Sequence, residues 1–329
     1  MVGNPYGQVA LRWGLLMVGA IVTGPASLPA AAEPGRKPLV VCTTTMIADL
    51  ATQIGGDRVN VVGIMKPKTD PHIYEPTPDD AMLLRKADLI LYNGLHLEGK
   101  MVQMIENAGS KAVALANDPR IKLRGMAGGG DAPDPHCWWS ARYFMIYTEG
   151  ARDALYNLDR DNAEFYQERT LAYLNQLRQA EKRVREAIKR IPEGQRVLVT
   201  SHDAFYYYGE AYGLEVNAVL GISTDAEVRA LRVNELANLV TERKVPAIFH
   251  ETSVSAALNQ MIDRVVEVAA RDGHTVRVPA EPLYSDSLDA PGTPAGTYIG
   301  ALLANTRIIV SALSGQDAGD IVRPLEGGS

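Results

Sequence analysis

Short apolar runs rich in β-branched residues alternate along the chain with longer amphipathic stretches. Four such runs lie in the first half, at 39–43, 59–65, 89–92 and 112–115, and four lie in the second half, at 197–200, 216–219, 247–250 and 275–278. The intervening segments have helical periodicity at 47–54, 78–86, 98–107, 226–243 and 256–272. Strands that alternate with helices are typical of βαβ units. The sequence therefore predicts an α/β protein in which each half has a four-stranded parallel sheet flanked by helices.

The longest periodic segment lies between the two halves. Asp161 and Glu164 form a capping pair that predicts a helix start, and apolar residues then recur on one face until Pro192. Roughly 30 residues at about 1.5 Å each would extend for on the order of 45 Å. A coiled-coil helix is the alternative, but the repeat is short. We expect one backbone helix over 159–191 that joins an N-terminal lobe (33–158) to a C-terminal lobe (192–329).

Residues 1–32 have the features of a secretory signal peptide. Arg12 precedes an apolar run at 14–22, and small residues then lead to three alanines at 30–32, a suitable cleavage site. The run is too short to span a bilayer. A lipoprotein would carry a cysteine at the cleavage point, whereas the first cysteine, Cys42, lies in a predicted strand. The sequence predicts a periplasmic protein that is soluble after cleavage and has no lipid attachment motif.

Composition narrows the class of function. A chain of 329 residues exceeds one ordinary core and suits two lobes. The formal net charge of −6 gives no support for nucleic-acid binding, which usually requires a basic surface. The two cysteines, Cys42 and Cys137, are too few for a disulfide scaffold or a thiolate zinc cluster. In an oxidising compartment they could pair with each other or remain buried thiols, and the sequence leaves both alternatives open.

Four potential metal ligands each follow a predicted strand. They are His72 and His136 in the first half, and His202 and Asp286 in the second half. Open α/β sheets bind ligands beyond the carboxyl ends of their strands, so we expect these side chains to converge between the lobes. Three imidazoles and one carboxylate suit zinc, manganese or ferrous iron. The sequence therefore predicts a site for one divalent metal ion.

The tripeptide Asp-Pro-His occurs twice, at 70–72 and at 134–136. Each aspartate could hydrogen-bond the loop backbone or the second imidazole nitrogen, as the outer partners of metal-bound histidines do. Glu251, at the end of a predicted strand, is a further candidate for such an outer acceptor. The pair His250-Glu251 does not continue as H-E-x-x-H, because residue 254 is Val254, and so it does not indicate a metalloprotease.

Several segments resemble signature motifs of the cluster A-I, or TroA-like, receptors of zinc, manganese and iron ABC transporters. They are 70–78 (DPHIYEPTP), 91–100 (LYNGLHLEGK), 134–136 (DPH), 201–205 (SHDAF), 221–224 (GIST) and 286–288 (DSL). The resemblance extends over residues 38–313. It implies a two-lobed receptor with a long helical backbone that delivers a divalent metal ion to an ABC permease in the inner membrane. It also implies that His72, His136, His202 and Asp286 take the family's four ligand positions.

The resemblance also bears on the metal and on the class of protein. Manganese-specific relatives often carry glutamate where this chain has His202, and a zinc-scavenging branch has a His-rich acidic loop that this chain lacks. The resemblance thus implies Zn²⁺ or Mn²⁺ as cargo, and admits Fe²⁺. A secreted metal-dependent hydrolase is the alternative, but catalytic zinc usually has three protein ligands and an open position. We expect a monomeric metal receptor that is not an enzyme and has no nucleic-acid partner.

Overall fold

The computed structural model describes residues 36–125 and 133–325. The predicted signal peptide and its cleavage site therefore lie outside the described residues. Residues Lys37–Ser329 group into one unit by their contacts. Within the described part of this unit, no helix combines the length and the apolar character that crossing a bilayer requires.

The first half of this unit contains a sheet of four parallel strands in the order β2-β1-β3-β4. The strands are β1 (Leu39–Cys42), β2 (Asn60–Gly63), β3 (Leu89–Tyr92) and β4 (Ala112–Ala114). The helices of this half are α1 (Thr45–Gly55), α2 (Pro78–Lys86), α3 (Val102–Glu106) and α4 (Ala141–Leu158). The predicted parallel sheet with flanking helices is confirmed here.

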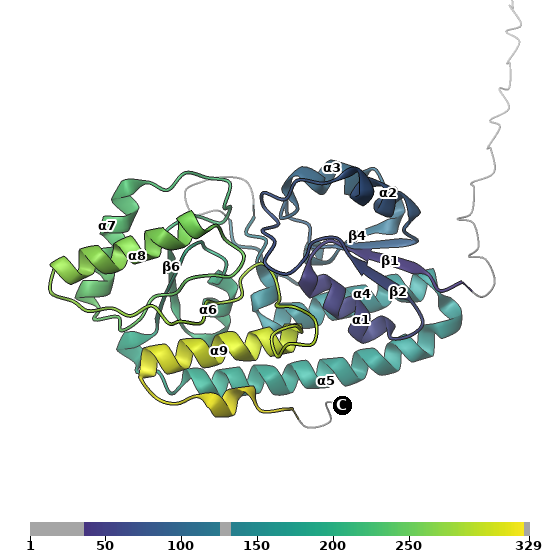
Figure 1. Cartoon of the computed structure of the whole chain (residues 1–329). Helices are drawn as coiled ribbons and strands as arrows, with labels where there is room; N and C mark the ends of the chain where they lie inside the picture. Colours follow the sequence, from purple (N-terminus) through teal and green to yellow (C-terminus); the bar gives the residue numbers. More distant parts are fainter. Residues whose placement is uncertain (1–35, 126–132, 326–329) are drawn as a thin grey trace, which may run out of the picture. The chain divides into compact units, whose positions relative to one another are not determined.

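Side chains of the central strands alternate between two cores, and helices lie on both faces of the sheet (Figure 1). Val40 and Cys42 belong to the large core that includes α1 and α4. Val41 packs with Ile90 in a smaller core beneath α2 and α3. This alternation follows from the period of two along a β-strand. Because both faces are covered, the central strands are almost entirely apolar.

A helix of 26 residues, α5 (Ala163–Ile188), runs beneath both halves and packs against α1, α4 and α9 (Figure 1). It confirms the long helix that was predicted to join the lobes. The residues before it, Arg160–Asn162, form a 3-10 turn rather than α-helix. The buried side of α5 contributes to the large core, so the helix is held by packing along its length.

The predicted capping pair of Asp161 and Glu164 was wrong. Asn162 occupies the position before α5, and its side chain caps no backbone group. Instead, Asp159 Oδ2 accepts hydrogen bonds from Asn162 Nδ2 (2.8 Å) and from the Tyr166 hydroxyl (2.7 Å). The carboxylate that stabilises this helix start therefore lies two residues earlier than the sequence pattern indicated.

The second half contains two regular parallel strands, β5 (Val197–Thr200) and β6 (Glu215–Ala218). The strands predicted at 247–250 and 275–278 are extended segments that meet at an isolated parallel bridge between Ala247 and Arg277. Phe249 N donates to Val199 O (2.9 Å), so the first of these segments still lies beside β5. The second sheet is therefore less regular than predicted.

Prolines explain this irregularity. Pro246 precedes the first extended segment, and Pro279 and Pro282 follow the second. Proline has no backbone N–H and cannot donate to a strand ladder. A further parallel bridge joins Glu251 to Leu283 beyond these prolines. The segments therefore remain parallel and adjacent although their ladder is interrupted.

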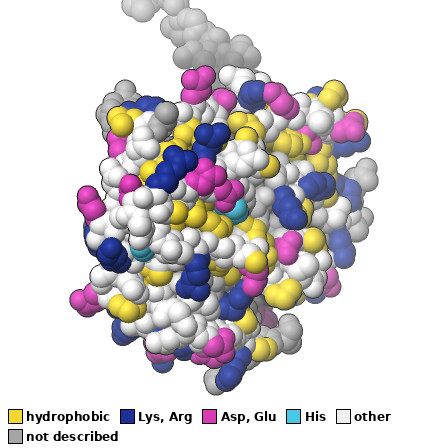
Figure 2. Space-filling model, turned by 60° about the vertical axis from the view of Figure 1, so that its left-hand side comes forward, with side chains coloured by type: hydrophobic (Ala, Val, Ile, Leu, Met, Phe, Trp, Pro, Cys, Tyr) yellow, Lys and Arg dark blue, Asp and Glu magenta, His cyan; other side chains and the backbone are white. Residues whose placement is uncertain are grey.

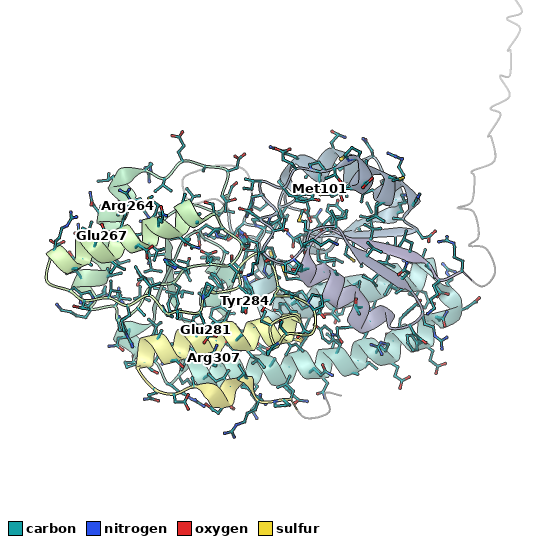
Figure 3. The ribbon with its side chains drawn as sticks, viewed as in Figure 1. Met101, Arg264, Glu267, Glu281, Tyr284 and Arg307 are labelled. Atoms are coloured by element: carbon teal, nitrogen blue, oxygen red, sulfur yellow. The ribbon has the colours of Figure 1, made fainter. Side chains whose placement is uncertain are left out.

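The helices of the second half are α6 (Tyr206–Tyr212), α7 (Ala230–Glu242), α8 (Ala256–Arg271) and α9 (Tyr298–Ser314). The predicted helices α7 and α8 are confirmed. Figure 3 shows Arg264 and Glu267 on the outer side of α8, opposite its buried Ile262 and Val265. This is the amphipathic pattern that made the helix predictable.

The sequence pattern missed α4, α6 and α9. Most of α9 is buried, so its sequence has no polar face that would indicate a helix. The first turns of α4 include Tyr143-Phe144-Met145-Ile146, a composition that strands favour. Short 3-10 helices occur at Gly99–Met101, Gly109–Lys111, Leu115–Asn117, Cys137–Trp139, Glu193–Gln195 and Gly319–Val322.

Candidate metal centre

The four predicted ligands meet at one point, although each belongs to a different loop. His72 lies between β2 and α2, His136 before α4, His202 between β5 and α6, and Asp286 before α9. One donor atom of each lies within 4.8 Å of all the others, and all four residues are buried. The structure thus brings together every residue that the sequence predicted as a ligand.

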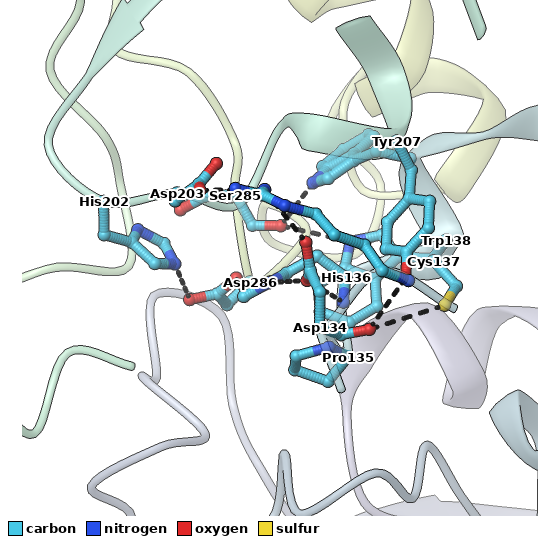
Figure 4. Close-up of polar contacts among 12 residues, drawn as sticks. Asp134, Pro135, His136, Cys137, Trp138, His202, Asp203, Tyr207, Ser285 and Asp286 are labelled. Atoms are coloured by element: carbon cyan, nitrogen blue, oxygen red, sulfur yellow. Dashed lines mark hydrogen bonds and ion pairs between the residues drawn. The ribbon is translucent and has the colours of Figure 1, made fainter. Parts of the chain in front are cut away.

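The Nε2 atoms of the three imidazoles face the carboxylate of Asp286. Its Oδ2 lies 3.0 Å from His202 Nε2 and 3.8 Å from His72 Nε2. Its Oδ1 lies 3.5 Å from His136 Nε2, which is 3.2 Å from His72 Nε2. Figure 4 shows His202 and Asp286 pointing toward each other. Within the part of the chain that the structure describes, neither oxygen of the Asp286 carboxylate has a hydrogen-bond donor of suitable geometry, so this donor set fits a shared cation.

Buried carboxylates orient two of the imidazoles. Asp134 Oδ1 lies 2.8 Å from His136 Nδ1, and Glu251 Oε2 lies 2.6 Å from His202 Nδ1. Each contact favours a proton on Nδ1, which leaves Nε2 available as a metal ligand. Glu251 Oε1 also accepts a hydrogen bond from His202 N (2.8 Å). Glu251 thus lies beside His202, where its predicted role as an outer acceptor would place it.

His72 is held through its backbone. Asp70 Oδ1 accepts a hydrogen bond from His72 N (2.9 Å), and among the described residues no carboxylate contacts the imidazole Nδ1. The loop ends at the capping box of α2, in which Thr77 and Asp80 each accept from the other's backbone N–H and Pro78 opens the helix. His72 is 8% exposed, whereas the other three ligands are at most 1% exposed. It therefore forms the solvent side of the centre.

Charges within the centre shift the pKa values of its ligands in different directions. Burial disfavours protonation of His202, but the charges of Asp286 and Glu251 outweigh it and raise the pKa of His202 well above its ordinary value. Burial lowers the pKa of His72 to about 3, against the attraction of Asp286. Burial also opposes ionisation of Asp286, but the histidines, His202 foremost, hold its pKa well below the usual range. A proton on His202 would therefore compete with any metal ion that this donor set held.

Two tryptophans from the first half close the inner side of the centre. The indole N–H groups of Trp138 and Trp139 both donate to Ser285 O, at 3.2 and 2.9 Å. Ser253 Oγ lies 2.7 Å from Ser285 Oγ and accepts a hydrogen bond from Asp286 N (3.0 Å). The backbone that carries Asp286 is thus fixed by both halves of the protein.

Arg124 links the aspartates beside two of the ligands, and the sequence analysis missed it. Its Nη1 lies 2.9 Å from Asp203 Oδ2 and 3.6 Å from Asp134 Oδ2. Asp203 directly follows His202, and Asp134 lies two residues before His136. No local sequence pattern distinguishes this arginine, because its partners lie 10 and 79 residues away and only the fold brings them together.

Gly99 supports the loop of His72. Its φ is +40°, and a Cβ at this position would lie 2.7 Å from the His72 carbonyl oxygen. Only glycine permits this close approach without strain. The neighbouring Glu98 is fully buried and accepts a hydrogen bond from the Thr43 hydroxyl (2.9 Å). The segment that the sequence singled out only by resemblance thus packs against a ligand loop.

The remaining histidines and the cysteines lie outside the centre. His96 is exposed, while His250 and His274 are hydrogen-bonded to Asp263 Oδ1 (2.9 Å) and Val245 O (2.8 Å). Cys42 and Cys137 are buried free thiols, which decides between the two alternatives left open above. Burial raises the pKa of both thiols, so neither is a thiolate ligand at neutral pH.

Known proteins share this fold and sequence. The family described as zinc-uptake complex component A, periplasmic, matches residues 40–312. The manganese-binding lipoprotein MntA of Bacillus subtilis (strain 168) is 40% identical over 278 residues, which cover 83% of this chain and 89% of the relative. The iron-binding protein YfeA of Yersinia pestis is 33% identical over 270 residues, which cover 81% of this chain and 83% of the relative.

The solved structure of the periplasmic zinc-binding protein TroA from Treponema pallidum has a TM-score of 0.79 at 36% identity. The match covers 85% of this chain and 100% of that chain. Fold and sequence together define a substrate-binding protein of a metal ABC transporter. The chain belongs to the family of periplasmic zinc-uptake complex component A. The predicted TroA-like resemblance and fold are confirmed. This family consists of binding proteins, and nothing in the comparisons supports the hydrolase alternative.

Proposed function

We propose that this protein captures one divalent metal ion, Zn²⁺, Mn²⁺ or Fe²⁺, and delivers it to the permease of an ABC transporter. The ligands are His72, His136, His202 and Asp286. The observation that carries this proposal is the convergence of four buried donor atoms within 4.8 Å of one another. Four protein ligands close the coordination shell, which suits the carriage of an ion rather than catalysis with one.

The donor types support a borderline cation as cargo. Imidazole nitrogen suits Zn²⁺, Fe²⁺ and related ions, whereas Mg²⁺ and Ca²⁺ prefer oxygen ligands. Relatives are named for binding manganese, iron and zinc, so the choice among these ions does not follow from membership of the family. Affinity for such donors rises from Mn²⁺ to Zn²⁺. We therefore expect Zn²⁺ to bind most tightly in vitro, whichever ion is transported.

A bound ion would bridge the two halves with little movement between them. Two ligands come from each half, and the halves also share hydrogen bonds that involve no ligand. Thr45 Oγ1 accepts from Leu288 N (2.8 Å), and Asp49 Oδ2 accepts from Tyr298 N (2.8 Å). With α5 packed against both halves, these contacts support small rocking and loop shifts rather than wide closure.

The protein acts in the periplasm as a monomer, with lobes at 33–158 and 192–329 joined by the helix at 159–191. Cleavage after residue 32 would release it from the membrane. The relative MntA is named a lipoprotein. In this chain Cys42 is fully buried in β1, which supports export without a lipid at that cysteine. On the face shown in Figure 2, acidic and basic side chains are interspersed. We expect the inner-membrane permease to recognise the metal-loaded form.

Metal titration of the purified protein, with elemental analysis, tests the site. We expect one ion per chain and a loss of about 100-fold in affinity for His202→Ala. The reason is that four ligands of a zinc site share roughly 10–16 kcal/mol, so that one ligand contributes about 3 kcal/mol. His250→Ala, which removes an imidazole outside the centre, is the matched control and should bind normally.

The transport role is tested in the native bacterium. A deletion strain should grow poorly when the transported metal is limiting, and the wild-type gene but not the His202→Ala variant should restore growth. Two ions per chain, or unchanged affinity in His202→Ala, would contradict the assigned ligands. Normal growth of the deletion strain under limitation for zinc, manganese and iron would contradict transport.

A further inference from the structure

The loop that carries His72, residues 66–77, is tied to the second half by two side-chain hydroxyls. Thr224 Oγ1 donates a hydrogen bond to Asp70 Oδ2 (2.6 Å). Ser287 Oγ accepts a hydrogen bond from Lys68 N (2.8 Å). Lys68 has a φ of +67°, a backbone conformation that few residues other than glycine adopt, and the bond to Ser287 helps to hold it there. Both hydroxyls therefore act on the conformation of one ligand loop.

This loop lies on the solvent side of the centre. His72 is the most exposed of the four ligands, and the neighbouring Ile73 is 44% exposed. The opposite side is closed by Trp138 and Trp139, which are at most 1% exposed. An ion that leaves the centre must therefore pass the His72 loop or separate the two halves.

Separating the halves would break many more contacts than moving the loop. Besides the bonds of α1 to Leu288 and Tyr298, Arg124 of the first half donates hydrogen bonds to two residues of the second half. Its Nη1 donates to Asp203 Oδ2 (2.9 Å), and its backbone N–H donates to the Tyr207 hydroxyl (2.9 Å). The loop itself has room to move, because a cavity of about 380 Å³ adjoins it. Its walls include Asp70, Ile73, Leu220, Thr224, Leu258 and Met261.

We infer that Thr224 and Ser287 are positioning residues that latch the His72 loop and set how fast a metal ion binds and leaves. This inference rests on the proposed function. Exchange occurs when the loop moves away from both hydroxyls and carries His72 with it, while the two halves stay together. His136 and His202 stay in place, because buried carboxylates hold their imidazoles.

The test compares the kinetics of Zn²⁺ exchange in wild-type protein and in Thr224→Val, which keeps the shape of the side chain and removes its hydroxyl. Stopped-flow transfer of Zn²⁺ to and from a chelating dye measures both rate constants. A hydrogen bond to a carboxylate is lost, so we expect both constants to rise roughly tenfold. The affinity should change much less than either rate, because the latch opposes binding and release alike.

Thr52→Val is the matched control, because among residues 36–125 and 133–325 the Thr52 hydroxyl bonds only Ala48 O (2.8 Å), within α1. Its exchange rates should equal those of the wild type. Ser287→Ala should also raise both rate constants. It replaces Thr224→Val in the test if that variant does not fold.

Two results would contradict the inference that Thr224 and Ser287 latch the His72 loop. One is unchanged exchange rates in the folded variants. The other is faster release without faster binding, which distorted ligand geometry would produce. If the wild-type protein bound no metal ion, the proposed function itself would fail. Normal metal binding with unaltered kinetics in Thr224→Val and Ser287→Ala would contradict only the role of these two hydroxyls and would leave the proposed function intact.

Discussion

The two Asp-Pro-His tripeptides lie at the same centre but have different surroundings. In both, the aspartate Oδ1 accepts a hydrogen bond from the backbone N–H of its own histidine, at 2.9 Å for His72 and 3.0 Å for His136. Only Asp134 also contacts the imidazole of its histidine, at 2.8 Å. Asp70 accepts a hydrogen bond from Thr224 of the second half instead.

The difference between the copies assigns them different tasks. Asp134 is fully buried and orients a ligand that is itself fully buried. Burial, with the repulsion of Asp286, raises the pKa of Asp70 to about 6, and its contacts hold a loop rather than an imidazole. The same three residues thus hold a fully buried imidazole, that of His136, in one place and a slightly more exposed one, that of His72, in the other.

The largest expected difference between the two Asp-Pro-His tripeptides is the effect of their aspartates on metal affinity. Asp134→Asn should weaken Zn²⁺ binding by roughly 10–100-fold, the usual effect of losing the outer partner of a metal-bound imidazole. Asp70→Asn should weaken it by less than about tenfold, because Asp70 touches no imidazole and the amide oxygen still accepts hydrogen bonds. Competition titration with a chelator measures both. Equal losses of affinity in the two variants would show that Asp70 and Asp134 support metal binding in the same way.

A pH effect should arise from His202 rather than from His72. At neutral pH a metal ion must displace the proton from His202, whose pKa is raised, whereas His72, with a pKa near 3, is already neutral. Affinity should therefore fall as the pH is lowered, by up to about tenfold per pH unit below the pKa of His202. Calorimetry in buffers of different ionisation enthalpy should detect about one proton released per ion.

Glu251→Gln provides the control for this pH effect. Without the Glu251 carboxylate the pKa of His202 falls, so fewer protons should be released at neutral pH. Metal binding without proton release in the wild-type protein would show that His202 is neutral before the ion binds.

The smallest expected effect concerns the support of the His72 loop. Gly99→Ala should destabilise the fold by about 1–3 kcal/mol and speed metal release several-fold, because the new Cβ presses on the His72 carbonyl. Gly109→Ala is the matched control, since Gly109 also has a positive φ (+63°) but meets nothing within 4 Å. Thermal unfolding and release kinetics should separate the two variants. Equal release rates in both would mean that the contact with His72 has no effect on the ion.

Much of this protein followed from local sequence. The apolar runs around β1 and β3 predicted a parallel sheet because covered strands must be apolar on both faces. The long repeat predicted α5, since one apolar face at helical spacing persists over many turns. The four candidate ligands could be picked out because each follows a predicted strand, at the edge where such sheets bind ligands. The helix α9 was not predicted because it is buried on most sides, so its sequence lacks the alternation of apolar and polar faces that indicates a helix.

The tertiary structure alone decided what surrounds the ligands. Sequence favoured the loop turns of both Asp-Pro-His copies, because a short aspartate side chain can accept a hydrogen bond from the N–H two residues ahead. It did not determine that Asp134 meets an imidazole, that Arg124 joins two aspartates, or that Thr224 bonds Asp70 across 154 residues. Such contacts depend on how separate segments pack, and packing is a property of the whole folded chain rather than of any stretch within it.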